Sequence, residues 1–349
     1  MPPQLVAVAA RQGGVFTRRQ ALEAGCSADE VRSLTRPRGE WLVVRRGVYV
    51  DRATWESLDP YVGQPLARDW AAHLTMRHRH VMSHDSAGRA YGLSLLRPRK
   101  DLVHVTRPGV GGSRTEHGVK HHLSQGLPWR SHEAAGLPVT PLARTAVDIG
   151  REQGLWGGVC AVDSALRCGA TERDFARALV AMKHFPHIRT ARAALAFGDP
   201  GAENAGESMA RILVAELALC GQVETQYPVR LGGRVVWLDL VVGRHAFEFD
   251  GKVKFKAVSD GGVAVRSAGE VAWDEKERQR LVCGQGLGMS RIVWDDFWGD
   301  ARHRARARLQ TEATITERTL GPTRPAHLEE FAVRMRDVRR RRIHPSPAV

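Results

Sequence analysis

Cysteine is scarce in this sequence and never closely paired. The chain has 349 residues and five cysteines, and no Cys-x-x-Cys pair occurs among them. Structural zinc sites and disulfide frameworks both need cysteines at close, regular spacing. Neither is therefore expected, and we predict that the thiols are reduced, small and mostly buried side chains. The five are Cys26, Cys160, Cys168, Cys220 and Cys283.

Long apolar runs are absent as well. No stretch of eighteen consecutive apolar residues occurs, the length that a membrane-spanning helix requires. The first residues, Met-Pro-Pro-Gln, lack the basic and then apolar pattern of a signal peptide. We therefore expect a cytoplasmic protein with no membrane partner. Apolar residues make up 43% of the chain, which is enough for packed domains, and the length predicts two or three of them.

Acidic residues are too few to balance the basic ones. The 38 acids face 52 lysines and arginines, which gives a net charge of +14. An excess of this size favours a polyanionic partner, nucleic acid above all. Residues 301–349 contribute +7 of it, with twelve arginines against five acids. Two arginine runs there, 302–308 and 339–342, either hold phosphates or form solvated helix faces and a frayed tail.

The first fifty residues have the pattern of a winged helix-turn-helix domain, which we place at 1–55. Three short helices are predicted at 5–11, 18–24 and 28–35, and a hairpin follows at 41–44 and 47–50. Thr17 and Ser27 stand where helix N-caps are expected. In this arrangement the third helix is the recognition helix, which lies in the major groove of double-stranded DNA.

Arginines are placed where such a domain would contact DNA. The recognition helix and the hairpin carry long, permanently charged donors of the kind that bind phosphates and groove edges. The alternative is a winged helix that contacts protein, with the same arginines merely solvated. The predicted nucleic-acid-binding residues of this domain are Arg32, Arg36, Arg38, Arg45 and Arg46.

The middle of the chain, 63–198, mixes predicted helices with short strands and is expected to be an α/β domain. Several histidines occur here, but they are spread over predicted helix and strand at no spacing typical of a zinc site. We interpret them as surface or core-edge groups: His78, His80, His84, His121 and His122. The segment 197–202, Phe-Gly-Asp-Pro-Gly-Ala, is the clearest predicted linker.

Carboxylates in two apolar strands are the most informative feature after this linker. Asp239 stands alone in the apolar run 235–242, and Glu248 and Asp250 alternate with Phe247 and Phe249. The period of two places both acids on one face and both rings in the core. Buried carboxylates need a compensating partner or cation, and Mg²⁺ prefers oxygen ligands of this kind. The pattern therefore predicts a Mg²⁺ site with Asp239, Glu248 and Asp250 as metal ligands.

These residues resemble the PD-(D/E)XK nuclease fold, in particular the branch similar to very-short-patch-repair endonucleases. The likeness covers 203–309 and rests on Glu207, Asp239, the run Glu248-Phe-Asp250-Gly251, and the positively charged residues of the following helix and strand. It implies a restriction-endonuclease-like α/β domain in which the strand acids hold Mg²⁺ and a lysine positions the attacking water. By this resemblance the predicted catalytic residues are Glu207, Asp239, Glu248, Asp250, Lys252 and Lys276, with Arg278 and Arg291 on the phosphate.

The match to that nuclease pattern has departures. Asp250 occupies the position where the family's name expects lysine, so Lys252 or Lys276 would have to reach the site from elsewhere. Leu238 replaces the proline before the first aspartate, and no histidine follows Asp250-Gly251. The alternative is an inactive site in which these acids pair with nearby basic side chains and only support the fold or bind DNA.

The N-terminal two-thirds of the chain resembles AbiEi-type antitoxins of type IV toxin–antitoxin systems. The matching segments are the winged helix, residues 83–87 (Ser-His-Asp-Ser-Ala) and residues 142–148 (Leu-Ala-Arg-Thr-Ala-Val-Asp). The resemblance implies a transcriptional repressor with a cognate toxin partner, and a homodimer is a further expectation. The sequence thus predicts a multi-domain α/β protein that ends in a basic extension, 310–349. It leaves two functions open: a Mg²⁺-dependent DNA endonuclease or nickase, and an antitoxin-type repressor with an inactive nuclease-like domain.

Overall fold

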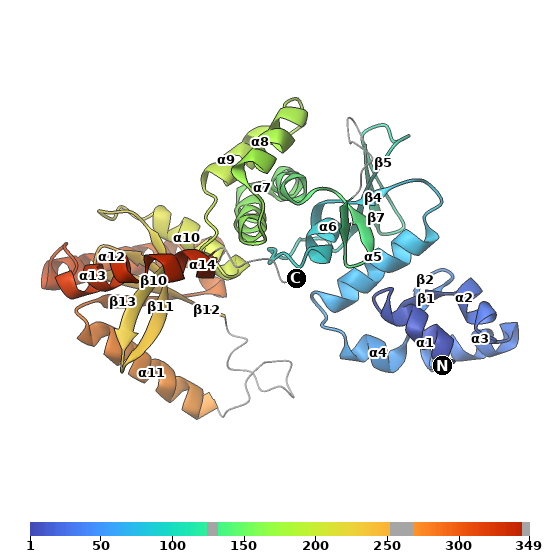
Figure 1. Cartoon of the computed structure of the whole chain (residues 1–349), viewed down its shortest axis with the longest axis horizontal. Helices are drawn as coiled ribbons and strands as arrows, with labels where there is room; N and C mark the ends of the chain where they lie inside the picture. Colours follow the sequence, from blue (N-terminus) through green and yellow to red (C-terminus); the bar gives the residue numbers. More distant parts are fainter. Residues whose placement is uncertain (124–131, 252–267, 344–349) are drawn as a thin grey trace. The chain divides into compact units, whose positions relative to one another are not determined.

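The computed structural model describes residues 1–123, 132–251 and 268–343 and has a mixed α/β architecture (Figure 1). Its contacts divide the chain into two compact units. Unit 1 consists of Met1–Gly154 and Thr171–Arg192, and unit 2 of Leu155–Ala170 and Ala193–Val349. Compactness does not test the boundaries expected from the sequence (1–55, 63–198, 203–309 and 310–349), which stay predictions.

Unit 1 begins with a winged helix. Its elements are α1 (Pro3–Ala10), β1 (Val15–Thr17), α2 (Arg18–Glu23), α3 (Ala28–Leu34), β2 (Trp41–Arg45) and β3 (Val48–Asp51). Thr17 and Ser27 each cap a helix, and in both cases a capping box satisfies two backbone N–H groups. The antiparallel sheet has the order β1-β3-β2, and β1 is a strand that the sequence pattern did not predict.

An aromatic core holds the winged helix together. The rings of Phe16 and Trp41 meet edge to face with centroids 4.8 Å apart, and Tyr49 packs against both. Val31 anchors α3 in the same cluster. The opposite face of the small sheet packs on a helix of the middle region, so the winged helix shares a core with the rest of unit 1.

The rest of unit 1 surrounds a mixed sheet. The elements are α4 (Arg52–Ser57), α5 (Gly63–Thr75), β4 (Val81–Met82), α6 (His84–Ala90), β5 (Val103–Arg107), β6 (Ser113–Glu116), β7 (Val119–Leu123), β8 (His132–Ala134), β9 (Leu137–Val139), the first part of α7 (Leu142–Arg167) and α8 (Glu172–Ala181). The described strands form one sheet in the order β6-β7-β5-β4-β9-β8. The β5–β7 and β4–β9 pairs are parallel, and the two strands of each pair are not consecutive in sequence.

Unit 2 is built on a second sheet with the order β10-β11-β12-β13. Its elements are the second part of α7, α9 (Ile188–Ala196, shared with unit 1), α10 (Ala205–Ala215), β10 (Glu224–Leu231), β11 (Arg234–Val242), β12 (His245–Asp250), α11 (Ala268–Gly284), β13 (Gly288–Val293), the 3-10 helix η3 (Trp294–Phe297), α12 (Gly299–Leu320), α13 (Ala326–Arg334) and α14 (Arg336–Ile343). The β12–β13 pair is parallel. Phe247 and Phe249 are buried, as the alternation in their strand predicts.

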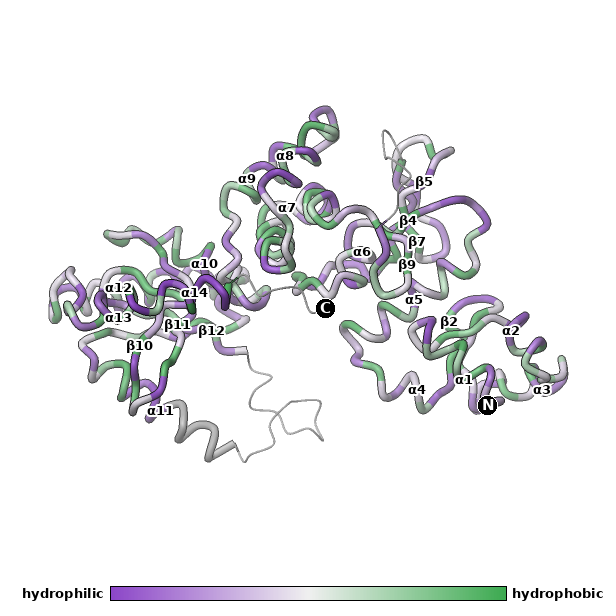
Figure 2. The backbone as a smooth tube through the Cα atoms, viewed as in Figure 1, coloured by the Kyte–Doolittle hydropathy of each residue, from purple (hydrophilic) through white to green (hydrophobic). Residues whose placement is uncertain are grey.

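The arginine runs near the C-terminus are largely engaged with the protein itself. In α12, Arg302 and Arg306 both pair with Glu216, and Arg308 pairs with Asp296 at 3.1 Å. In α14, a strongly hydrophilic helix (Figure 2), Arg342 pairs with Glu203 at 2.5 Å. These contacts favour a fold-supporting role for much of both runs over a solvated or phosphate-binding one.

Some local expectations were wrong. The sequence predicts a helix over 69–80, but α5 ends at Thr75. The sequence pattern predicts no strand at β10, because this segment contains a proline, Pro228, and lacks clear alternation. The cysteines are not mostly buried: Cys168, Cys220 and Cys283 are exposed, although all five are free thiols. Among the described residues, no helix combines the length and apolar character needed to cross a membrane.

Candidate functional site

The winged helix presents its recognition helix to solvent. Asp29 and Glu30 lie in the first turn of α3, where the helix dipole favours acids. The exposed side chain of Arg32 pairs with Asp29, with Nη1 and Oδ1 2.7 Å apart. Since this is a surface i,i+3 pair, it is weak and can exchange for a phosphate contact at little cost.

The predicted arginines beyond α3 fall into two groups. Arg36, Arg38 and Arg46 are exposed, the first two after α3 and the third at the turn between β2 and β3. Arg45 differs: its Nη1 donates a hydrogen bond to the carbonyl oxygen of His117 at 3.0 Å, and burial lowers its pKa. Of the two wing-tip arginines, Arg46 is therefore the one better placed for a DNA phosphate.

In unit 2, carboxylates from three elements approach one another. The register that pairs Leu240 with Phe247 places Asp239 of β11 beside Glu248 of β12. The backbone N–H of Phe249 donates to Asp239 Oδ2 at 2.9 Å. Glu207, in the first turn of α10, is buried, and burial together with the negative charge of Asp239 raises its pKa to about 8. Glu207 is therefore largely protonated at neutral pH.

The basic residues predicted for this site occupy different positions. Arg278 on α11 lies against Glu248, with Nη2 and Oε2 3.0 Å apart, and Arg291 on β13 lies 3.7 Å from Asp250. Lys276 is exposed on α11, and Lys252 lies outside the described residues. The structure thus brings Glu207, Asp239 and Glu248 together with Arg278, and it joins Asp250 with Arg291.

The carboxylates fit a Mg²⁺ ion in donor type but not fully in arrangement. Hard oxygen donors are what Mg²⁺ requires. However, Glu248 is already paired with Arg278, and Glu207 accepts hydrogen bonds from the backbone N–H of Glu203 and the side chain of Asn204. Among the described residues, the group whose ligand atoms lie close enough together to hold a metal ion as they stand consists of histidines and not of these acids. A bound cation would therefore have to displace or rearrange existing contacts.

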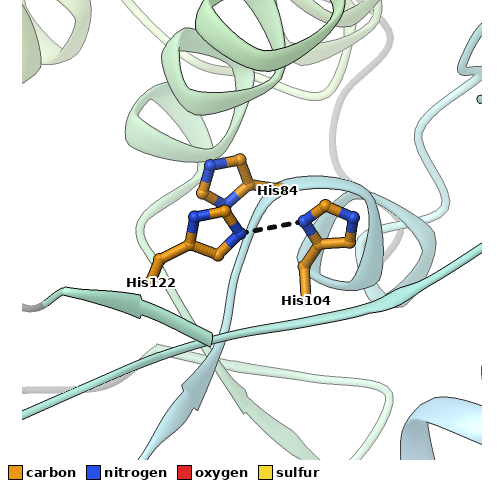
Figure 3. Close-up of side chains that lie close together, drawn as sticks. All are labelled: His84, His104 and His122. Carbon is orange, nitrogen blue, oxygen red and sulfur yellow. Dashed lines mark hydrogen bonds between the residues drawn. The ribbon is translucent and has the colours of Figure 1, made fainter. Parts of the chain in front are cut away.

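A second cluster of ionisable groups, made of histidines, lies in unit 1 (Figure 3). His104 and His122 come from the adjacent parallel strands β5 and β7, and His84 begins α6. His104 Nδ1 and His122 Nε2 are 3.0 Å apart, and the rings of His84 and His122 stack with centroids 3.8 Å apart. One ring nitrogen of each histidine lies within 4.8 Å of those of the other two.

Burial keeps this histidine cluster uncharged. His84 and His104 are each 3% exposed, and burial lowers the pKa of both far below the ordinary value. Burial likewise lowers the pKa of His122 to about 4. The three imidazoles are therefore neutral at physiological pH, with nitrogen lone pairs able to accept a proton or a cation.

Two aspartates stand behind the histidines. His104 Nε2 lies 3.9 Å from Asp85 Oδ2, and His84 Nε2 lies 4.0 Å from Asp148 Oδ1. Burial raises the pKa of Asp85 to about 6. Asp148 also pairs with Arg144 at 2.7 Å and Arg151 at 2.8 Å.

A cavity of about 260 Å³ opens beside the cluster. His84 and His122 form part of its wall, and the guanidinium groups of Arg144 and Arg151 lie over the ring of Phe185 at 5.2 and 4.9 Å. The cavity gives a small molecule or ion access to two of the three histidines.

The sequence interpretation of the histidines was therefore wrong in part, although His78 is exposed as predicted. His84 and His121 are buried rather than surface groups, His84 and His122 belong to one cluster, and His104 was not considered. His80 instead pairs with His73, their ring nitrogens 3.0 Å apart. A usable signal existed for His104 alone, which lies between two buried valines, Val103 and Val105, in its short strand.

Comparison with known proteins supports the N-terminal assignment. Residues 3–50 match the family model AbiEi_4, described as "Transcriptional regulator, AbiEi antitoxin". The crystal structure of the RV2827C protein from Mycobacterium tuberculosis is similar at 17% identity and a TM-score of 0.34, over 65% of this chain and 87% of that one; a likeness this weak carries no inference. Comparison with curated proteins found no match. Residues 3–50 are thus similar to AbiEi-type regulators, and the nuclease resemblance of 203–309 stays a prediction.

Proposed function

We propose that this protein is a DNA-binding transcriptional regulator of the antitoxin type. The observation that carries the proposal is the winged helix at residues 3–50, which matches a family of transcriptional regulators. Its recognition helix α3 is capped, anchored by Val31 and otherwise open to solvent. A solvent-facing recognition helix beside a basic hairpin is the arrangement that docks in a major groove.

In this proposal the domain's arginines have separate tasks. Arg32 projects from α3 and faces base edges or the groove wall, while Arg36, Arg38 and Arg46 contact phosphates on either side. The net charge of +14 adds long-range attraction to the polyanion. Arg45 contributes less than Arg46, because its guanidinium is held by His117.

A binding experiment with a matched control tests the proposal. Specific double-stranded fragments would first be selected from a randomised pool, and their affinity measured by fluorescence anisotropy at several salt concentrations. We expect Arg32→Ala to weaken binding about tenfold or more, and Arg46→Ala to lower the salt dependence by about one phosphate contact. Arg177→Ala is the control, because Arg177 forms the same exposed i,i+3 pair, with Asp174, on α8. Equal affinity for all sequences and all variants would contradict the proposal.

A second candidate function, a Mg²⁺-dependent DNA endonuclease or nickase, is supported by the carboxylates of unit 2. A glutamate with a pKa raised to about 8 beside two further acids is typical of functional sites, though ion-pair networks also produce it. A bound Mg²⁺ would activate water and neutralise charge on the phosphate. In this candidate Asp239, Glu248 and Asp250 bind the metal, Glu207 assists them, and Lys252 or Lys276 positions the water. Arg278 and Arg291 hold the phosphate.

Supercoiled plasmid distinguishes the two candidates. The protein would be incubated with plasmid and Mg²⁺, Mn²⁺ or chelator, with Glu248→Ala and Asp239→Ala tested in parallel. Metal-dependent nicking that both variants abolish would establish the nuclease. An intact plasmid under every metal, with DNA binding preserved in chelator, would exclude it and leave the regulator.

A cognate toxin partner and a homodimer are parts of the antitoxin proposal. The matched family model is described as an antitoxin, and a dimer would match two half-sites of a palindromic operator. Light scattering after gel filtration measures the oligomeric state. Co-purification with the product of an adjacent gene tests the toxin partner, and a monomer that retains no such protein would contradict both parts.

A further inference from the structure

We infer that His84, His104 and His122 form a binding site for a divalent transition-metal ion, with Zn²⁺ as the best match. The site is separate from the winged helix and from the carboxylates of unit 2, and it does not depend on either function proposed above. Imidazole nitrogen is a ligand that Zn²⁺ and related borderline metals prefer, whereas Mg²⁺ takes oxygen ligands.

The spacing of the ring nitrogens suits a metal of this size. Zinc–nitrogen bonds of about 2.0–2.1 Å at tetrahedral angles separate the ligand atoms by roughly 3.3 Å. His104 Nδ1 and His122 Nε2 are already 3.0 Å apart, and the third nitrogen lies within 4.8 Å of both. Side-chain rotations that move the ring nitrogens by about 1.5 Å or less would therefore complete a three-nitrogen site.

The backbone around the cluster is fixed. His104 and His122 lie on adjacent strands in the interior of the sheet, where β5 pairs with both β4 and β7. His84 has a φ of +50°, a conformation that costs energy for a residue with a side chain. From this position the His84 ring stacks on that of His122 with centroids 3.8 Å apart, and one of its nitrogens lies within 4.8 Å of the other two ligand nitrogens.

The acids behind the histidines have the arrangement of outer-sphere partners. Metal-bound histidines commonly direct their second nitrogen to a carboxylate, which orients the ring and strengthens the ligand. His104 turns Nδ1 toward His122 and Nε2 toward Asp85, 3.9 Å away. Asp148 lies near Nε2 of His84 at 4.0 Å.

The site has an open side. Three protein ligands with a free fourth position are typical of zinc ions that exchange water or bind a substrate, whereas purely structural zinc usually has four protein ligands. The 260 Å³ cavity adjoins His84 and His122 and contains the guanidinium groups of Arg144 and Arg151 on its wall. The fourth ligand is therefore water or a small anion that enters from this cavity.

Metal titration of the full-length protein tests the inference. After dialysis against chelator, the protein would be titrated with Zn²⁺ by calorimetry and with Co²⁺ by visible absorption, and with Mg²⁺ as a comparison. We expect one equivalent of Zn²⁺ or Co²⁺, visible Co²⁺ bands typical of a four-coordinate nitrogen site, and no Mg²⁺ binding at this site. A small anion such as azide should change those bands by occupying the open position.

Three variants assign the site. His122→Gln and His104→Gln should each weaken Zn²⁺ binding at least tenfold. Loss of a residue that only hydrogen-bonds a metal ligand already weakens metal binding by about tenfold or more, and loss of the ligand itself should cost at least as much. His73→Gln is the control, because His73 forms a histidine pair with His80 in the same unit but outside the cluster. His122 is only half-buried, so His122→Gln keeps the test valid if His104→Gln fails to fold. Absence of Zn²⁺ binding by the parent protein would overturn the inference, as would unchanged binding in folded His122→Gln.

Discussion

The histidine cluster of unit 1 and the carboxylate cluster of unit 2 solve the same physical problem in opposite ways. Each buries several ionisable groups of one type, and such groups are costly to bury when charged. The histidines avoid charge because their pKa values fall, to about 4 for His122. Glu207 avoids charge because its pKa rises to about 8. One unit therefore excludes protons from its cluster, and the other retains one.

The two buried clusters differ in the ligand atoms that they offer to a metal ion. Neutral imidazoles offer nitrogen to transition metals, while carboxylates offer oxygen to Mg²⁺ once a proton has left. Two of the histidines, His104 and His122, are hydrogen-bonded to each other, whereas Glu248 is in contact with a guanidinium. We therefore expect transition-metal ions to bind the histidines of unit 1 and Mg²⁺ to bind only the carboxylates of unit 2.

The largest expected effect is stabilisation by zinc. At a free Zn²⁺ concentration a hundred times its dissociation constant, a site present only in the folded state adds about 2.7 kcal/mol to the free energy of unfolding. Hydrogen exchange on peptides from each unit should locate this effect in unit 1. The stabilisation by Zn²⁺ should vanish in His122→Gln and persist in Glu207→Gln. Protection from hydrogen exchange in unit 2 instead of unit 1 would show that Zn²⁺ does not bind the histidines.

A smaller effect is expected from Glu207→Gln at alkaline pH. The folded protein holds a proton on Glu207 up to about pH 8, and the unfolded chain loses it near pH 4.5. The stability gained from this proton is full below pH 4.5 and is lost as the pH rises to about 8. Glu207→Gln has no such proton to lose, so its stability relative to the parent should increase between pH 5 and pH 8.5. Thermal melts in chelator at pH 5 and 8.5 measure this.

The same melts carry their own check. Near pH 5, where Glu207 is protonated, parent and variant should be nearly equal. In further melts with Mg²⁺ in place of the chelator, binding of Mg²⁺ to the carboxylates should raise the melting temperature of the parent at pH 8.5. The same addition should have less effect on Glu207→Gln. A constant difference at all pH values would show that Glu207 does not titrate as proposed.

Acid should affect the histidine cluster in the opposite sense. Each buried histidine stays neutral in the folded state, while the unfolded chain takes up a proton near pH 6.5. Stability is therefore complete above pH 6.5 and is lost as the pH falls toward 4. Because His122→Gln removes one such group, its stability should fall by about 1 kcal/mol less than that of the parent between pH 7 and 5. Denaturant titrations at both pH values, without metal, measure the loss; an identical loss in both proteins would refute the assignment.

The smallest effect concerns the pair between Arg278 and Glu248. The Glu248 side chain is 10% exposed and that of Arg278 is 35% exposed, so solvent weakens their attraction only in part. Arg278→Ala should lower the free energy of unfolding by about 0.5–1 kcal/mol. Arg280→Ala, on the same helix with an exposed partner in Glu277, is the matched control and should leave stability unchanged. If the two variants behave alike, Glu248 does not depend on its guanidinium.

Local chemistry made part of this structure predictable. Thr17 and Ser27 begin their helices as predicted, because a capping side chain needs only residues within one turn. Phe247 and Phe249 are buried because alternation in a strand is equally local. The carboxylates could be identified as candidate site residues for the same reason, because Asp239 is the single charged residue in the apolar run 235–242.

The histidine cluster was beyond such reasoning. His104 and His122 meet only because β5 and β7 pair in parallel, and β6 lies between them in sequence but at the edge of the sheet in space. His84 joins them from a positive φ of +50°, a backbone conformation that is uncommon for residues with a side chain. Register and strand order are set by the whole sheet, so spacing along the chain gave no ligand pattern.

The division of α7 has a consequence for how this protein can be taken apart. The chain passes from one unit to the other at Gly154, whose φ of +85° separates two helical halves, returns by residue 171 and crosses again after residue 192. Phe185 under Arg151 therefore belongs to unit 1, while Asp163, paired with Arg211 at 2.8 Å, belongs to unit 2. Each unit consists of two separate segments of the chain, so no single cut of the polypeptide separates the two units. Neither unit corresponds to one continuous stretch of sequence that could be expressed or exchanged between proteins.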